Sequence, residues 1–247
     1  MWYHKNDKNY KTKNYKIRNF YIMITLSQVN NNKNILEFIK KSDESLKQIG
    51  YTEHGLKHAQ LVADRARTIA KELGYSKEIQ EMAAVSGFCH DMANFLSRIQ
   101  HHYLGSLLFY DTFKDEYPIE ELIPIMQAIA SHDKDELDKD EVEIVNVVTA
   151  ILILADKSDV RRSRVLRSDK QSLKEDIHAR VNYATKQSKL SIDKKQKRIN
   201  LTLIIDTKIT PIMEYFEIFT QRMVYCRKAA NYLGYDFGLI INNFKLL

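Results

Sequence analysis

Histidine and aspartate recur at positions where the chain should bury hydrocarbon. In the stretch "SGFCHDMANF", residues 86–95, His90 and Asp91 stand side by side at the end of an apolar run, and Asp156 interrupts the apolar run "AILILADKSD". An ionised carboxylate in such surroundings is costly unless it is paired or binds a metal. Imidazole and carboxylate are the usual protein ligands of divalent transition metals, and a site assembled across helices takes one or two ligands from each helix. The pattern therefore predicts a metal site.

Histidines are concentrated in one part of the chain. Six of the eight lie within about a third of it: His54, His58, His90, His101, His102 and His132. Taken alone, a core-facing histidine such as His58 or His132 is better explained by a hydrogen bond to a backbone carbonyl. Asp156 alone could pair with a nearby base. A single metal site explains all of these residues together.

The elements that would position these side chains are mainly helices. The chain has only seven Gly and three Pro residues, and apolar residues recur at spacings of three and four. Gly50 and Gly74 are typical of the residues that end helices. We expect helices over residues 33–49, 53–73, 77–93, 100–115, 119–132, 141–157 and 170–186.

The pattern changes to alternation after residue 186. The stretch "KLSIDKKQKRINLTLIID" predicts a β-hairpin around a charged turn. Thr210-Pro211 predicts the start of a helix that runs to Gly234, and a short strand is expected at residues 237–241. The expected fold class is therefore mainly α, a helical bundle with a small C-terminal α+β extension made of a β-hairpin and a long helix.

Charge and composition limit the domains and the partners. The formal net charge of the 247 residues is +6, but residues 1–22 hold six basic residues and one acid, so the remaining residues are almost neutral. That balance makes nucleic acid an unlikely partner. We expect a disordered basic tail at 1–22, a metal-binding helical domain at 33–165 and an extension at 166–247 that packs on it. Whether translation begins at Met23 stays open.

Membrane and redox signals point to the cytoplasm. No apolar run reaches the roughly 18 residues of a membrane span, and no small-residue cleavage site follows the short apolar run near the N-terminus. Cys89 and Cys226 lack a neighbouring second cysteine, which fits a reducing compartment. We expect a cytoplasmic protein with no membrane partner, and a homo-oligomer is an open alternative to a monomer.

The order of the histidines and aspartates resembles that of the HD superfamily of metal-dependent phosphohydrolases, whose ligands are a His, a His-Asp pair and a distant Asp. The segments "HAQLVADRARTIAKELG" and "GYSKEIQEMAAVSGFCH", which join the first His to the pair, have equal length and meet at Gly74. The resemblance covers roughly residues 50–165. It implies six metal ligands: His58, His90, Asp91, His101, His132 and Asp156. Of these, His101 and His132 correspond to the histidines that are added in branches with more than one metal.

Other positions have roles that the resemblance implies less directly. His54 and His58 are four residues apart and would share a helix face, so either could be the first ligand. The family has an apolar residue four positions after that ligand, and Val62 stands four positions after His58, which favours His58. His54 then either supports a ligand or contacts substrate. Asn94, where many relatives carry Lys, and Arg161 are expected to contact substrate. No Gly-Tyr-Pro segment follows His132, which disfavours the branch that cleaves cyclic dinucleotides.

The implied activity is metal-dependent phosphohydrolysis, as in small bacterial HD-domain proteins without an established substrate. One or two divalent ions such as iron or manganese would activate a water that attacks a phosphomonoester or phosphodiester, with a nucleotide as the expected substrate. Asp91 and Lys157 are the expected catalytic residues. Arg162 and Arg164 are better explained as part of a solvated helix end. The alternative function is a non-catalytic regulatory protein that keeps the metal pocket to bind a nucleotide.

Overall fold

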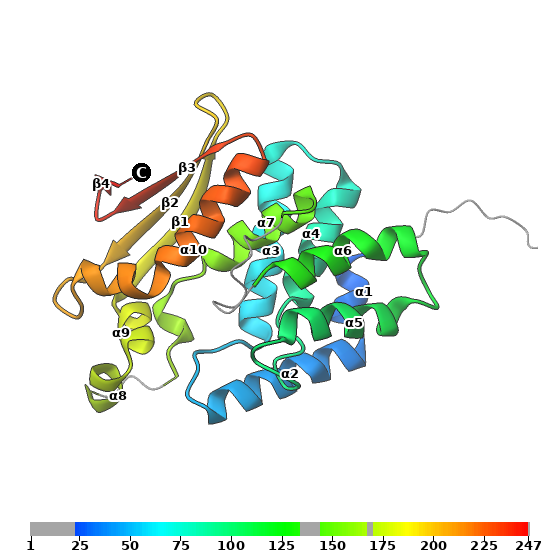
Figure 1. The fold of residues 1–247 in the computed structure, drawn as a ribbon, viewed down its shortest axis with the longest axis horizontal. Coiled ribbons are helices and arrows are strands. Elements are labelled where there is room, and N and C mark those ends of the chain that lie inside the picture. Colours follow the sequence, from blue (N-terminus) through cyan, green and yellow to red (C-terminus); the bar gives the residue numbers. More distant parts are fainter. Residues whose placement is uncertain (1–22, 134–143, 167–169, 247) are drawn as a thin grey trace, which may run out of the picture.

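The computed structural model describes residues 23–133, 144–166 and 170–246 (Figure 1). The predicted tail at residues 1–22 lies outside the described residues. The helices are α1 (Leu26–Asn30), α2 (Lys33–Gln48), α3 (Leu56–Leu73), α4 (Lys77–Cys89), α5 (His101–Phe113), α6 (Ile119–Ser131), α7 (Val147–Lys157), the short 3₁₀ helix η1 (Arg162–Arg164), α8 (Lys170–Glu175), α9 (Ile177–Ala184) and α10 (Ile212–Tyr232). The strands are β1 (Thr185–Asp193), β2 (Arg198–Ile205), β3 (Asp236–Ile241) and β4 (Phe244–Lys245).

Helix α7 is at the centre of the helical bundle. Every residue from Val148 to Lys157 is buried, and the helix contacts α3, α4, α6 and α10. A helix that is apolar on all sides is stable only inside a protein. Asn146 caps its N-terminus by accepting a hydrogen bond from the Thr149 amide at 2.8 Å. The last turn of α7, which carries Asp156, therefore lies deep in the protein.

Helices α3 and α4 pack closely at Gly87. A Cβ atom at this position would lie 2.9 Å from the Cα and the backbone nitrogen of Ala63, so the approach requires glycine. Gly74 ends α3 in the left-handed conformation with a φ of 86°, and Ser76 then caps α4. This short connection makes the two helices direct neighbours and brings the start of α3 beside the end of α4.

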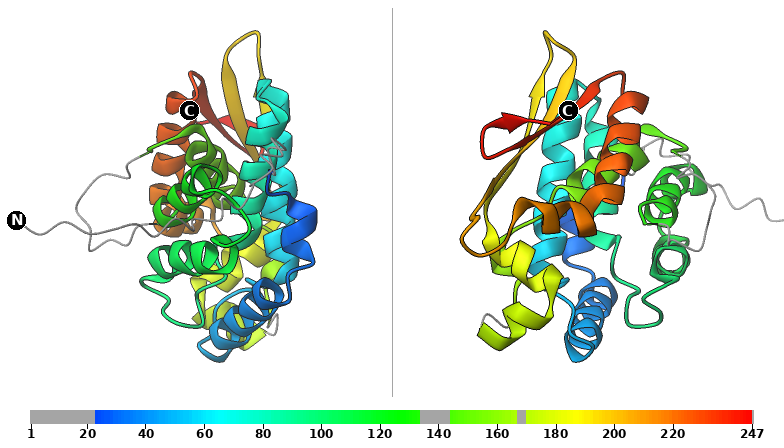
Figure 2. Two further views of the ribbon diagram at one scale, coloured as in Figure 1. Left: turned by 90° about the vertical axis from the view of Figure 1, so that its right-hand side faces the viewer. Right: turned by 60° about the vertical axis from the view of Figure 1, so that its left-hand side comes forward.

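The C-terminal part of the chain forms a small mixed sheet with the strand order β1-β2-β3-β4. β1 and β2 form the predicted antiparallel hairpin, β3 runs parallel to β2, and β4 is antiparallel to β3. Helix α10 crosses one face of the sheet and also contacts α7 (Figures 1 and 2). Alternate residues of β2, such as Leu201 and Leu203, are buried in the same hydrophobic core as α7. The expected fold class is therefore confirmed, whereas the domain boundary at residue 165 stays a prediction.

Several element boundaries differ from those expected. α4 ends at Cys89, so His90 and Asp91 lie in the turn that follows the helix and do not interrupt it. The expected helix over residues 170–186 is divided into α8 and α9 by Asp176, whose side chain caps α9. Short local signals, such as an Asp that can accept a backbone hydrogen bond, end helices where apolar periodicity alone would continue them.

Two further findings concern the chain ends and membranes. Helix α1 was not expected, because five residues are too few to show a helical period. A capping box at Thr25 and Gln28 stabilises it.

In the described ranges, no helix combines the length and apolarity that a membrane crossing requires.

Candidate metal centre

The six predicted metal ligands lie in one buried cluster at the ends of five structural elements. His58 comes from the first turn of α3, His101 is the first residue of α5, and Asp156 lies in the last turn of α7. The turn after α4 contributes His90 and Asp91, and His132 directly follows α6. All four histidines are at most 1% exposed. The groups that these side chains form could hold a metal ion.

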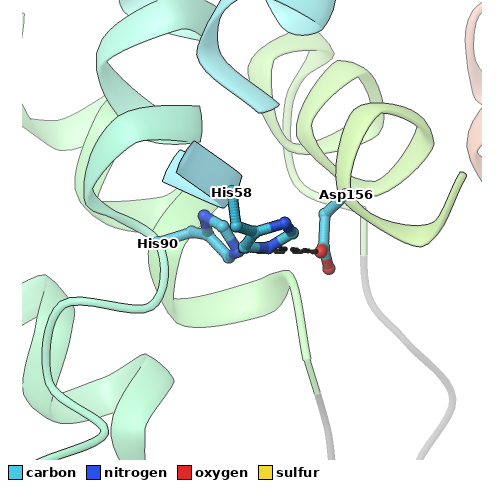
Figure 3. Close-up of side chains that lie close together, drawn as sticks. All are labelled: His58, His90 and Asp156. Carbon is cyan, nitrogen blue, oxygen red and sulfur yellow. Dashed lines mark hydrogen bonds and ion pairs between the residues drawn. The ribbon is translucent and has the colours of Figure 1, made fainter. Parts of the chain in front are cut away.

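The first group joins α3, α4 and α7 (Figure 3). The Nε2 atoms of His58 and His90 are 3.2 Å apart. Oδ1 of Asp156 lies 3.4 Å and 3.6 Å from these two nitrogens. Oδ2 of Asp91 lies 3.2 Å from the His90 nitrogen and 3.7 Å from that of His58. Two imidazoles and two carboxylates thus point their donor atoms at one small volume.

The second group joins α5 and α6 on the other side of Asp91. The Nε2 atoms of His101 and His132 are 3.3 Å apart. Oδ1 of Asp91 lies 3.3 Å from the former and 3.8 Å from the latter. Asp133 adds a carboxylate oxygen 3.8 Å from the His101 nitrogen. Asp91 therefore presents one carboxylate oxygen to each group.

The other ring nitrogen of each histidine donates a hydrogen bond away from the cluster. Nδ1 of His90 donates to the Gly87 carbonyl at 2.8 Å, and Nδ1 of His132 to the Ile129 carbonyl at 2.7 Å. A carbonyl can only accept, so these nitrogens carry the proton and each Nε2 presents a lone pair when the ring is neutral. Burial lowers the pKa of His132 to about 4, which keeps that ring neutral at physiological pH.

His58 and His101 follow the same pattern. Nδ1 of His58 donates to Oδ2 of Asp159 at 2.8 Å, and Nδ1 of His101 donates to the Arg98 carbonyl at 2.7 Å. Metal-binding histidines usually have such a partner on the second nitrogen, because it fixes the ring and the tautomer.

The Nε2 atoms of each histidine pair face each other and belong to groups that could hold a metal ion. Two neutral Nε2 atoms at 3.2–3.3 Å cannot hydrogen-bond to each other, whereas a divalent cation would bind both. Burial lowers the pKa of His90, but the charges of Asp91 and Asp156 outweigh this and raise it to about 10. A proton therefore takes the place of a cation when no metal is bound. The nitrogen and oxygen donor set fits divalent ions such as iron, manganese or zinc, and it contains no thiolate.

Asp159 was not predicted as a site residue. It is buried, and besides His58 it contacts Arg161 Nε at 2.8 Å and Arg164. Burial favours its neutral form, but the hydrogen bond from His58 and the two guanidinium groups hold the pKa of Asp159 well below its usual range. In the sequence, its position three residues after Asp156 was the only signal, and a weak one. Its contact with His58 joins residues that are far apart in the chain and could not be foreseen.

Asp133 was also missed, although it follows His132 and so repeats the His-Asp order of the first pair. It begins the acidic stretch "DKDELDKDE", in which no single carboxylate stands out. Lys157 lies between the two groups, with Nζ 2.9 Å from carboxylate oxygens of both Asp133 and Asp156. The predicted catalytic lysine is thus buried in an ion-pair network beside the cluster.

The predicted substrate residues have different surroundings. His54 precedes α3, which begins at Leu56, so the helix-face argument does not apply to it. Its ring lies edge-on to that of His58 at 5.6 Å between centroids, and it does not join the ligand groups. Asn94 donates to the backbone and to Oδ1 of Asp91, each at 3.0 Å. Arg161 contacts Asp159 and Glu53 and so supports His58 indirectly.

The expectation for Arg164 was wrong. Its side chain is 4% exposed and not solvated, and it donates to the carbonyls of Glu53 and Asp159 at 3.1 Å and 3.2 Å. These bonds connect η1 to the chain that enters α3, a pairing that local sequence does not show. Arg162 is exposed and stacks on the Tyr183 ring at 4.5 Å, as expected of a residue at a solvated helix end.

Comparisons with known proteins identify a relative without a known activity. An uncharacterized protein of Methanocaldococcus jannaschii, MJ1020, is 24% identical over 157 residues, which are 54% of this chain. The match covers 58% of the length of that relative. No family model matches the chain. The helical fold and the buried cluster of histidines and aspartates, which could hold a metal ion, fit a site of the HD type.

Proposed function

We propose that this protein belongs to the HD superfamily and is a metal-dependent phosphohydrolase with two divalent metal ions that share Asp91. The observation that carries the proposal is the approach of two pairs of histidine Nε2 atoms, at 3.2 Å and 3.3 Å, on either side of one carboxylate. A site that only stabilised the fold would not need this arrangement, because salt bridges or apolar side chains would serve equally well.

Each part of the cluster has a defined task in this proposal. When bound, the metal ions would supply a water of lowered pKa and polarise the phosphoryl group. Asp91 fixes the distance between the two groups, and Asp159 holds the His58 ring in the required tautomer. Lys157 keeps a positive charge beside Asp133 and Asp156, since these carboxylates outweigh burial and raise its pKa. If metal ions were held by these carboxylates, the Lys157 ammonium group would be placed to donate to a phosphoryl oxygen.

Metal content together with turnover tests the proposal. Protein purified without chelator, or reconstituted with Mn²⁺ or Fe²⁺, is expected to hold two metal equivalents per chain by elemental analysis, and to hydrolyse a member of a panel of nucleotides and phosphodiesters. Chelation should abolish turnover, and added metal should restore it. Protein that binds no metal after reconstitution would contradict the proposal. A metal-loaded protein that binds one nucleotide tightly without turnover would favour the regulatory alternative.

Variants of His58 and His54 test which of the two histidines is a metal ligand. His58→Ala removes an imidazole from the first group and should lower the metal content by at least one equivalent. His54→Ala should keep the metal content and lower kcat/KM by about 10–100-fold at most, as expected of a residue that acts through a ligand. The two variants are matched controls for each other, and elemental analysis with steady-state kinetics compares them. The reverse order would show that the ligand assignment is wrong.

A further inference from the structure

A cavity of about 710 Å³ adjoins the metal centre. Asp133, Lys157 and His54 line it on the side of the helical bundle, and α9 and α10 line it on the side of the C-terminal extension. Its volume is in the range of pockets for small organic ligands and much larger than a phosphate ion requires. Residues far apart in the chain thus form one chamber beside the cluster.

Most of the positive charge in this cavity is already paired. Arg98 lies 3.5 Å from a carboxylate oxygen of Asp133. Lys157 forms ion pairs with Asp133 and Asp156. Arg164 donates to the carbonyls of Glu53 and Asp159 and lies beside the Asp159 carboxylate. These cations balance the acidic residues of the centre and are not free to bind a ligand before metal is present.

Arg222 of α10 is the exception. Within residues 23–133, 144–166 and 170–246, its guanidinium group forms no hydrogen bond or ion pair, and its guanidinium carbon lies 4.7 Å from the centre of the Phe219 ring. Burial lowers the pKa of Arg222, and the carboxylate of Asp156 opposes this more than any other charge does. Arg222 also lines the same cavity as Asp133 and Lys157, which adjoin the candidate metal centre. A half-buried guanidinium without a partner is costly, and a bound anion would remove that cost.

The rest of the cavity wall suits an organic group. Tyr51, Phe219 and Tyr225 bring aromatic rings to it, and Ile99 and Ile218 add aliphatic surface. Aromatic walls with a few convergent charged groups are typical of sites for flat, partly apolar ligands.

We propose that Arg222 binds the phosphoryl group that reacts at the metal centre, and that the substrate is a small organic phosphate with an aromatic part of the nucleotide type. This inference rests on the proposed function and makes the C-terminal extension part of the substrate site. A bidentate contact from a guanidinium group to phosphoryl oxygens is the expected geometry, because the two shapes match.

Binding of inorganic phosphate, the expected product, tests the role of Arg222. Isothermal titration of the metal-loaded full chain should show that Arg222→Met weakens phosphate binding by about 10–100-fold, the cost of a charge-assisted hydrogen bond. The methionine keeps the hydrocarbon contact with Phe219, and Arg222→Lys should recover part of the affinity. Arg227→Met, an exposed change on the same helix, is the matched control and should leave binding unchanged. Thermal unfolding of each variant checks that the fold is intact.

The outcomes separate this inference from the proposed function. Equal phosphate affinity in Arg222→Met and the unchanged protein, or no phosphate binding by either, would overturn the role of Arg222. The proposed function is judged separately by metal content and turnover. For the aromatic part, AMP should bind more tightly than ribose 5-phosphate, which lacks only the base. Equal affinities would overturn that part of the proposal.

Discussion

Asp91→Ala is expected to abolish phosphohydrolysis and to reduce bound metal at both groups, while the helical circular dichroism spectrum is retained. One oxygen of Asp91 faces His90 and the other faces His101, at 3.2 Å and 3.3 Å. Burial favours the neutral form of this carboxylate, but His90, His101 and His132 hold the pKa of Asp91 well below its usual range. It is thus a permanent negative charge that both groups share. The loss of kcat/KM should exceed the roughly 100-fold that removal of a residue outside the ligand set can cost.

Two further variants make this result specific. Asp91→Asn keeps the shape and removes the charge, and should lose metal almost as completely. Asp111→Ala removes an aspartate whose side chain is 72% exposed on the helix that carries His101, and should change neither metal content nor activity. Asp91→Ala protein with full metal content and turnover would rule out the shared-carboxylate site. Elemental analysis and steady-state kinetics provide both readings.

Gly87→Ala is expected to destabilise the protein by about 1–3 kcal/mol, the usual cost of overpacking a core. The added methyl group would meet backbone atoms of Ala63 at 2.9 Å, and backbone cannot move aside as a side chain can. α3 and α4 must separate, which moves His58 away from His90. We therefore expect a weaker metal affinity as well as a lower free energy of unfolding, measured by urea denaturation of the metal-free protein.

Gly105→Ala is the matched control. The nearest atom to its added methyl group is Cγ2 of Ile129 at 3.3 Å, which a small side-chain adjustment can accommodate. Alanine also favours a helix by about 1 kcal/mol over glycine, so this variant should be about as stable as the unchanged protein. If Gly87→Ala proved no less stable than Gly105→Ala, the close approach of α3 and α4 would be wrong.

The sequence predicted well those features that depend on local chemistry. Helical periodicity and the glycines at positions 50 and 74 gave the order of the long helices, because burial of one apolar face and a left-handed terminal residue leave direct marks in the chain. The alternation between residues 189 and 206 likewise predicted the hairpin of β1 and β2. The ends of helices were less predictable, since α4 stops at Cys89 within a run whose apolar pattern continues.

The candidate ligands could also be found from the sequence, because histidine and aspartate in apolar runs are costly unless they bind something. That the group could hold a metal ion was predictable too, because residue type alone decides which atoms can donate to a metal.

Only the tertiary structure decided how these residues are grouped. It arranges the candidate ligands on two sides of Asp91, leaves His54 out of the groups that could hold a metal, and adds Asp159 beside His58 and Asp133 beside His101. It also brings Arg222 of α10 to the cavity beside His54. These contacts join residues that are far apart in the sequence. The distances between them depend on how the helices pack, for example on the close approach of α3 and α4 at Gly87, and no local pattern in the chain encodes that packing.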